Sequence, residues 1–191
     1  MMILLEYGFV FLMLVLSALS AATFVIFVLD SLIYGHDLPT SRRAAKALVV
    51  AVKQYKPDAK NFYDLGCAHG DLCLRLKKDL PDVAIWGIDK SPVRIFFAKL
   101  KARILRRKAN FKKQDIFQTD LSNADVVYTY LWYDRMSPLE EKLQKELKPG
   151  ALVITNTSRF PNLEPLQKIS VSSKVFPKMP DHEILFVYVK A

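Results

Sequence analysis

Cysteine and histidine are scarce in this 191-residue chain, which has two of the first and three of the second. Cys67 and Cys73 are separated by five residues, and His36, His69 and His182 are scattered along the chain. This spacing does not match a zinc site, so we expect no metal centre. Two thiols this close together are typical of small buried apolar groups in a reducing compartment, more than of a disulfide.

Charge is missing altogether from residues 7–29, which are nearly all apolar. At about 1.5 Å per residue, such a helix can cross the roughly 30 Å hydrocarbon layer of a membrane. A cleaved signal peptide and a buried core helix are the alternatives. A signal peptide normally begins with basic residues, whereas Glu6 is the only charge ahead of this run. The sequence therefore predicts one transmembrane anchor within residues 1–30.

Basic residues are absent from this anchor. Residues 31–191 therefore hold all 28 basic residues and 17 of the 19 acidic residues, which gives this part a net charge of about +11. Arg42, Arg43 and Lys46 follow the anchor closely, and no basic residue precedes it. Positive residues normally stay on the cytoplasmic side of a span. We therefore expect a single-pass membrane protein whose C-terminal domain is cytoplasmic.

The length after the anchor suits one ordinary domain. Residues 31–39 are predicted to be a linker and residues 40–191 the domain. Thr40 or Ser41 can cap a first helix that runs to about Tyr55.

Strand and helix patterns alternate through most of this domain, which is typical of a parallel sheet covered on both faces. The last two predicted strands, Ile169–Phe176 and Glu183–Val189, are joined by a connection too short for a helical crossover, so we expect them to pair antiparallel. The fold class is therefore α/β, a Rossmann-like seven-stranded sheet with an antiparallel C-terminal hairpin. The other predicted strands are 61–66, 83–88, 111–114, 125–131 and 151–155, and the other predicted helices are 71–80, 92–108 and 138–147.

Small residues are concentrated where the first predicted strand turns into the next helix. Gly66, Ala68 and Gly70 follow Asp64 at alternate positions. A dinucleotide fingerprint needs G-x-G-x-x-G, whereas this spacing matches the D-x-G-x-G-x-G pattern of methyltransferases. Small residues let the backbone approach a ligand, and the following helix offers free N–H groups.

Two further acids close the next two strands. Asp89 lies 19 residues after Gly70, where a carboxylate can accept the ribose hydroxyls of a bound nucleoside. Asp115 ends the third strand, where an adenine ring is usually held. Together with the glycine turn, these acids predict a site for S-adenosyl-L-methionine.

On these motifs the chain resembles class I S-adenosylmethionine-dependent methyltransferases. It is similar above all to a protein-lysine methyltransferase family that includes an archaeal enzyme and membrane-anchored mitochondrial enzymes acting on the ATP synthase c subunit and the adenine nucleotide translocase. The resemblance runs from Leu38 to the C-terminus and implies methyl transfer to a protein substrate. One departure is Ala68-His69-Gly70-Asp71, where the family usually has Gly-Asp-Gly-Arg. We expect His69 to face water or to alter cofactor affinity, and not to be a catalytic base.

The acceptor site is expected beyond the fourth strand, in the aromatic segment 128–134. It contains no Asn-Pro-Pro-Tyr motif, which disfavours adenine or glutamine as acceptor. Aromatic rings can face an amine, so Trp132 and Tyr133 are our candidates for the catalytic acceptor site. Tyr130 is a candidate cofactor contact, although its spacing from Tyr128 also suits the core.

Acidic residues are absent from 94–113, which holds nine Lys and Arg residues. They suit a solvated helix face, or anionic lipid headgroups at about 1 kcal/mol for each Lys or Arg. We expect Phe96, Phe97, Leu100 and Ile104 to form the inner face of this helix. The same charge would attract RNA, but no RNA-binding module flanks the domain, so nucleic acid is the less favoured partner.

The sequence thus predicts a membrane-anchored methyltransferase that acts on a lysine of a membrane or membrane-associated protein. Two other classes fit the same motifs. One is a methyltransferase for a lipid-soluble small molecule or RNA, and the other is a non-catalytic module that binds S-adenosylmethionine.

Overall fold

The computed structural model describes residues 2–171 and 183–191 of the chain. It divides into two compact units, Met1–Asp37 and Leu38–Ala191.

The first unit is the single helix α1 (Met2–Tyr34). Residues Tyr7–Tyr34 have a mean hydropathy of 2.6, and the helix is long and apolar enough to cross a membrane, a test that a signal sequence also passes. Helix α1 continues through four residues of the predicted linker, Ser31 to Tyr34, none of which is a Gly or Pro. Gly35, with a φ of +83°, ends it by donating its N–H to the carbonyl oxygen of Ser31 at 2.9 Å.

The second unit begins with α2 (Arg42–Tyr55). Of the two caps that the sequence allows, the structure uses Ser41, whose hydroxyl accepts the N–H of Ala44 at 3.1 Å. One face of α2 is apolar and buried against the sheet. The helix is therefore fixed at its start by the cap and along its length by packing.

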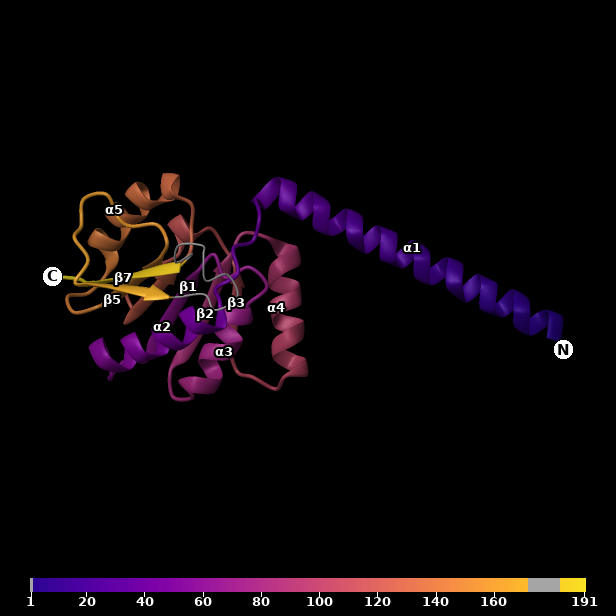
Figure 1. Cartoon of the computed structure of the whole chain (residues 1–191), viewed down its shortest axis with the longest axis horizontal. Coiled ribbons are helices and arrows are strands. Elements are labelled where there is room, and N and C mark those ends of the chain that lie inside the picture. The colour runs from indigo at the N-terminus through magenta and orange to yellow at the C-terminus, as the bar shows by residue number, and fades with distance from the viewer. Residues whose placement is uncertain (1, 172–182) are drawn as a thin grey trace. The chain divides into compact units, whose positions relative to one another are not determined.

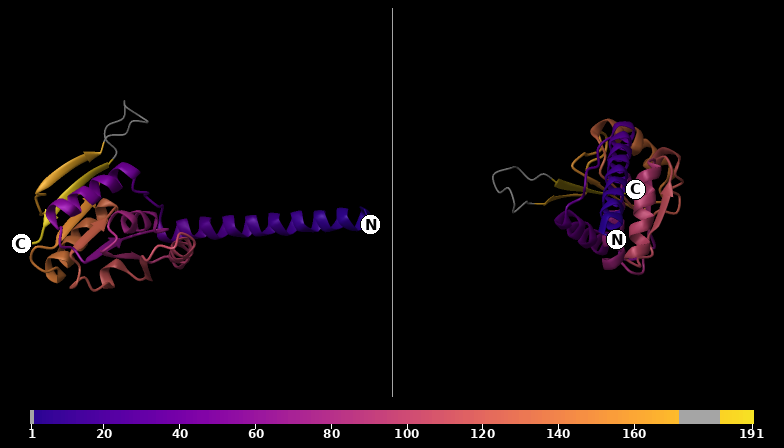
Figure 2. Two further views of the ribbon diagram at one scale, coloured as in Figure 1. Left: turned by 90° about the horizontal axis from the view of Figure 1, so that it is seen from below. Right: turned by 90° about the vertical axis from the view of Figure 1, so that its right-hand side faces the viewer.

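The second unit is built on one seven-stranded sheet with the order β3-β2-β1-β4-β5-β7-β6. The first five strands are parallel, and β7 pairs antiparallel with both β5 and β6. This confirms the predicted fold class, and Figure 2 shows the β6–β7 hairpin at one edge. The strands are β1 (Asn61–Leu65), β2 (Ala84–Asp89), β3 (Asn110–Lys113), β4 (Val126–Thr129), β5 (Leu152–Asn156), β6 (Gln167–Val171) and β7 (Glu183–Val189). The end of the strand predicted to reach Phe176, and the connection up to His182, lie outside the described residues.

Helices cover both faces of the sheet. Helices α2, α3 (Asp71–Asp79) and α4 (Pro92–Ile104) pack on one face, and α5 (Met136–Glu146) packs on the other (Figure 1). Side chains along a strand point alternately to the two faces. In β1, Phe62 accordingly joins the core under α2 and α3, while Leu65 joins the core under α5.

The predicted inner face of α4 is wrong. The helix buries Ile95, Ala98 and Ala102 against the sheet. Of the four predicted residues, Phe96, Leu100 and Ile104 are exposed and Phe97 is half-buried. The physical reason is the narrow gap under the helix. Helix α4 passes close to Phe111 of β3 and to the backbone at Gly70, so only small side chains fit on that side. The bulky apolar side chains are left on the outer face.

Candidate active site

The strand order reverses at β1, which lies between β2 and β4. The chain steps outward from β1 to β3 and then returns to β4 on the other side. In such open α/β sheets, ligands bind in the crevice outside the carboxyl ends of the strands at this switch point. Strand register places Leu65, Ile88 and Thr129 side by side at that edge.

The turn after β1 is held in a left-handed conformation. The φ angles are +87° at Gly66, +45° at Ala68 and +74° at Gly70. The N–H groups of Gly66 and Cys67 both donate to the carbonyl oxygen of Ile88, at 2.9 and 3.0 Å. The turn is therefore bound to the end of β2, and it leads directly into the N-terminus of α3.

Packing also requires that two residues of the turn have no side chain. A Cβ on Gly70 would lie 2.5 Å from a ring carbon of Phe111 and 2.9 Å from the Cβ of Ala98. A Cβ on Gly66 would lie 3.1 Å from Leu131, in the segment that follows β4. The absence of a side chain at Gly70 thus lets the turn lie close to α4 and β3. Its absence at Gly66 lets the segment after β4 approach the turn. Because Gly70 has no side chain to cap α3, the first-turn N–H groups of α3 suit a negatively charged ligand group.

Asp89 joins this turn to the next helix. Its Oδ2 accepts the N–H of Ala68 at 2.9 Å, and its Oδ1 accepts the N–H of Ser91 at 2.9 Å. The residue is only 7% exposed. These bonds fix the carboxylate at the carboxyl end of β2, where an acid can face the ribose of a bound nucleoside.

Asp64 lies deeper than the other candidates, on the side of β1 that faces α3. Burial raises its pKa to about 7, although the Cys73 thiol, 3.3 Å from Oδ2, acts in the opposite direction and Asp89 adds to the rise. Both cysteines are buried and free, as predicted. Asp64 therefore contacts α3 through Cys73 and can hold a proton near neutral pH.

The raised pKa of Asp64 predicts a pH-dependent stability. The folded protein holds a proton that the unfolded chain releases around the ordinary value of 3.8, so this stabilisation is full below that pH and is lost as the pH rises through about 7. From pH 5.5 to 8 the free energy of unfolding should fall by about 1 to 2 kcal/mol. Asp64→Asn should remove most of this slope in denaturant titrations of the full chain in detergent, and the exposed Asp58→Asn should retain it. Equal slopes in wild type and Asp64→Asn would contradict the assignment.

Asp115 lies beyond β3 as the cap of the short 3-10 helix η1 (Ile116–Gln118). Its Oδ1 accepts the N–H of Phe117 at 2.8 Å, and its Oδ2 pairs with Lys90 Nζ at 2.8 Å. Partial burial alone would raise the pKa of Asp115, but the Lys90 bond and the Phe117 N–H outweigh it, so the pKa is lowered. The carboxylate thus connects the ends of β3 and β2 across the edge of the site.

The aromatic segment after β4 divides into a packed half and an exposed half. Tyr128 is buried and Tyr130 packs against the core under α2 and α3, while Trp132 and Tyr133 are 60% and 64% exposed. Leu131 approaches Gly66, so Trp132 follows a residue that touches the glycine turn. Both exposed aromatic residues thus lie in the segment that follows β4 and Leu131.

A buried polar network beside the site is missing from the sequence predictions. The Tyr128 hydroxyl lies 2.7 Å from Thr40 Oγ1 and accepts from Asn156 Nδ2 at 3.1 Å. Glu183 Oε1 accepts from the same Asn156 nitrogen at 2.9 Å and from the N–H of Ser41 at 3.0 Å. The network ties the start of α2 to β4, β5 and β7. The separation of its members along the chain leaves no local pattern that could reveal it.

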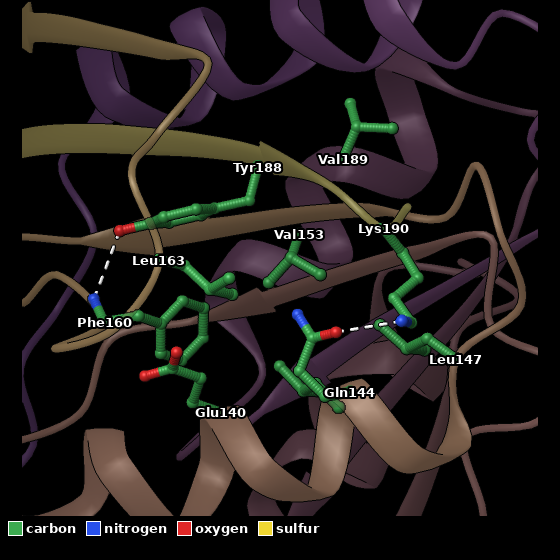
Figure 3. Close-up of a pocket in the computed structure, with 10 residues that line it drawn as sticks. Glu140, Gln144, Leu147, Val153, Phe160, Leu163, Tyr188, Val189 and Lys190 are labelled. Carbon is green, nitrogen blue, oxygen red and sulfur yellow. Dashed lines mark hydrogen bonds between the residues drawn. The ribbon is translucent and has the colours of Figure 1, made fainter.

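A separate hollow lies under α5. Figure 3 shows Tyr188 and Phe160 on one side of it, and Gln144 of α5 with Lys190 on the other. The Tyr188 hydroxyl accepts the N–H of Phe160 at 3.1 Å, and Lys190 Nζ donates to Gln144 at 2.9 Å. Its lining includes none of the acids or glycines at the strand ends, so it is distinct from the candidate site.

Comparison with solved structures confirms the fold. The fold resembles an RNA methyltransferase from Salinibacter ruber in complex with S-adenosyl-L-homocysteine, with a TM-score of 0.66 and 20% identity over 80% of this chain and 93% of that one. It also resembles magnesium protoporphyrin IX methyltransferase from Synechocystis PCC 6803 with bound S-adenosylmethionine, with a TM-score of 0.59 and 13% identity over 82% and 87% of the two chains. These likenesses show the fold of a Rossmann-like S-adenosylmethionine-dependent methyltransferase.

Sequence comparison narrows this class to a family. The model of the ANTKMT methyltransferase domain matches residues 64–167, more than half of the chain. The chain therefore belongs to the ANTKMT methyltransferase family. It is also 28% identical to a protein-lysine N-methyltransferase of Saccharolobus islandicus over 70% of this chain and 83% of that protein. A carboxy-S-adenosyl-L-methionine synthase of Nautilia profundicola is 27% identical, but the match spans only 49% of its length.

The predicted family, enzyme class and cofactor are confirmed by these matches. The protein is an S-adenosylmethionine-dependent methyltransferase. The turn and the uncapped N-terminus of α3 fit that cofactor, whose parts include a carboxylate, and Asp89 at the end of β2 suits its ribose.

Proposed function

We propose that the enzyme methylates a lysine side chain of a membrane or membrane-associated protein. The observation that carries this proposal is the exposed pair Trp132 and Tyr133, which directly follow Leu131 at Gly66 of the turn, in a chain of the ANTKMT family. The likeness to a protein-lysine N-methyltransferase supports the choice of acceptor.

The cofactor would be held by residues of the first three strand ends. Asp89, fixed at the end of β2, would accept the ribose hydroxyls, and Asp115 with Lys90 would border the adenine. Gly66, Ala68 and Gly70 would shape the turn under the methionine part, whose carboxylate suits the N-terminus of α3. The remaining proposed cofactor residues are Asp64, which contacts α3 through Cys73, and Tyr130.

S-adenosylmethionine supplies a methyl group on a positively charged sulfur. The lysine nitrogen would have to be neutral to accept this methyl group, and the sulfur would keep the electron pair of its broken C–S bond. Trp132 and Tyr133 would flank the aliphatic stem of the lysine and exclude water, which lowers the pKa of its ammonium. Positioning is the main contribution of the protein.

Helix α1 would anchor the enzyme as a single-pass span, with the domain of residues 38–191 in the cytoplasm. The basic residues after the helix support this orientation. Seven residues, 35–41, connect α1 to α2, and extended chain covers at most about 3.5 Å per residue. An anchored domain would thus remain within about 25 Å of its span, which raises the local concentration of membrane-bound acceptors.

Mass spectrometry of membrane fractions tests the acceptor. Cells with the protein should contain methylated lysines on membrane or membrane-associated proteins that disappear when the gene is deleted and return with the intact enzyme. Incubation of the purified enzyme with membranes from the deletion strain should restore the same sites. Methylation of lipid extracts or RNA without any lysine product would contradict the proposal and leave the methyltransferase assignment intact.

A further inference from the structure

The outer face of α4 is apolar where a helix on the surface of a soluble domain is normally polar. Phe96 is 62% exposed, Leu100 40% and Ile104 69%. Each residue turns a helix by about 100°, so these three positions form one continuous stripe. Ile95, Ala98 and Ala102 occupy the opposite side, which is buried against the sheet. This second apolar stripe therefore contributes nothing to the described core of the domain.

Cations border this stripe on both sides. Lys99 and Arg103 are exposed along one side, and Lys101 lies along the other, where it pairs with Asp71 at 2.9 Å. Four further exposed basic residues follow the helix, namely Arg106, Lys108, Lys112 and Lys113. An apolar stripe with aromatic and leucine side chains between rows of Lys and Arg is the pattern of a helix that lies in a membrane interface.

We propose that the outer face of α4 binds the surface of an anionic lipid bilayer. Phe96, Leu100 and Ile104 insert at the boundary of headgroups and acyl chains, while Lys99 and Arg103 contact anionic headgroups. A second copy of the chain would bring the same uncompensated cations together, and like charges oppose such a contact. The bilayer is thus the partner that satisfies both the apolar and the basic side chains.

This contact would orient the active site. Helix α4 begins at Pro92, three residues after Asp89, at the edge of the sheet that carries the site. The ring of Phe97 lies 6.3 Å from that of His69 in the glycine turn. The end of the stripe at Phe96 is therefore close to the turn, and a docked α4 would hold the site near the membrane surface. The inference concerns a surface and not the acceptor, so it holds or fails separately from lysine methylation.

Fluorescence quenching by brominated lipids tests the contact in the full chain. Leu100→Cys carries an environment-sensitive fluorophore in the middle of the stripe, and Lys145→Cys carries it on α5, across the sheet. The native cysteines are buried. Both proteins are placed in nanodiscs of phosphatidylcholine, with or without phosphatidylserine. We expect strong quenching at position 100 in the anionic discs, less in the neutral discs, and little at position 145 in either.

Charge reversal provides the second arm. Loss of two cations at about 1 kcal/mol each corresponds to a roughly 30-fold weaker docking equilibrium, so Lys99→Glu with Arg103→Glu should greatly reduce quenching at position 100. The same reversal at the exposed Lys145 and Lys148, at the end of α5, should leave it unchanged. Equal quenching at positions 100 and 145 would overturn the proposal. Quenching at position 100 that changes neither with lipid charge nor with the charge reversal would overturn it as well. A third result would also overturn it. If the fluorophore at position 100 were shielded from water but not quenched by bromine, and the shielding grew with the number of chains per disc, a second copy would cover the face.

Discussion

Asp89→Ala should weaken binding of S-adenosylmethionine by about 1.5 to 3 kcal/mol, roughly 10- to 150-fold, the cost of a lost charge-assisted hydrogen bond. Two effects act in the same direction. The proposed ribose acceptor disappears, and the N–H groups of Ala68 and Ser91 lose the carboxylate that fixes the turn. Calorimetric titration of the full chain with the cofactor measures the change.

Two further variants make this result specific. Asp89→Asn retains one carbonyl oxygen and should bind with intermediate affinity, whereas Asp58→Ala removes an exposed carboxylate far along the sequence and should bind like wild type. Thermal unfolding of each variant separates a loosened turn from a lost contact. An Asp89→Ala protein that binds the cofactor with unchanged affinity would remove Asp89 from the site.

The geometry of the candidate cofactor site could be predicted from the sequence because its determinants are local. Gly66, Ala68 and Gly70 adopt positive φ within one short turn, and Asp89 terminates the adjacent strand. Parallel strands bring their carboxyl ends to one edge whatever the details of packing. What the spacing did not reveal is that Gly70 is required by Phe111 and Ala98. That requirement depends on how closely α4 approaches β3.

Helix α4 shows where sequence periodicity failed. Its apolar residues form two stripes of opposite direction, and helical spacing alone cannot tell which one faces the sheet. The stripe with small side chains, Ala98 and Ala102, packs against the sheet because the helix comes closest to the sheet there. Phe96 and Ile104 are therefore exposed. The stripe with larger side chains was the natural choice for a core and was the wrong one.

The polar network at the start of α2 could not be predicted for a different reason. Ser41 and Glu183 are 142 positions apart, and Asn156 contacts both Tyr128 and Glu183. Only the pairing of β7 with β5 brings the acid to this place. Buried polar side chains of this kind need partners, so the network fixes the start of α2 beside the site.

Trp132→Ala should lower turnover on a lysine acceptor by roughly 10- to 100-fold, about 1.4 to 2.7 kcal/mol of transition-state stabilisation, and leave the affinity for S-adenosylmethionine nearly unchanged. The reason is position. The side chain follows Leu131, which approaches Gly66, but it is 60% exposed and contributes little to the core. Its removal would open the proposed lining to water, so the lysine would remain protonated and less well held.

The comparison that decides the role of Trp132 combines single-turnover rates with cofactor titration. Trp132→Phe keeps an aromatic face and should recover much of the rate, while Trp86→Phe in β2 changes the chain's other tryptophan, which stacks on Tyr63 within the sheet, and should have a smaller effect on turnover. If Trp132→Ala lost rate and cofactor affinity in equal proportion, the residue would belong to the cofactor site. If it lost neither, the acceptor would have to enter by another side of the strand ends, away from the segment after β4.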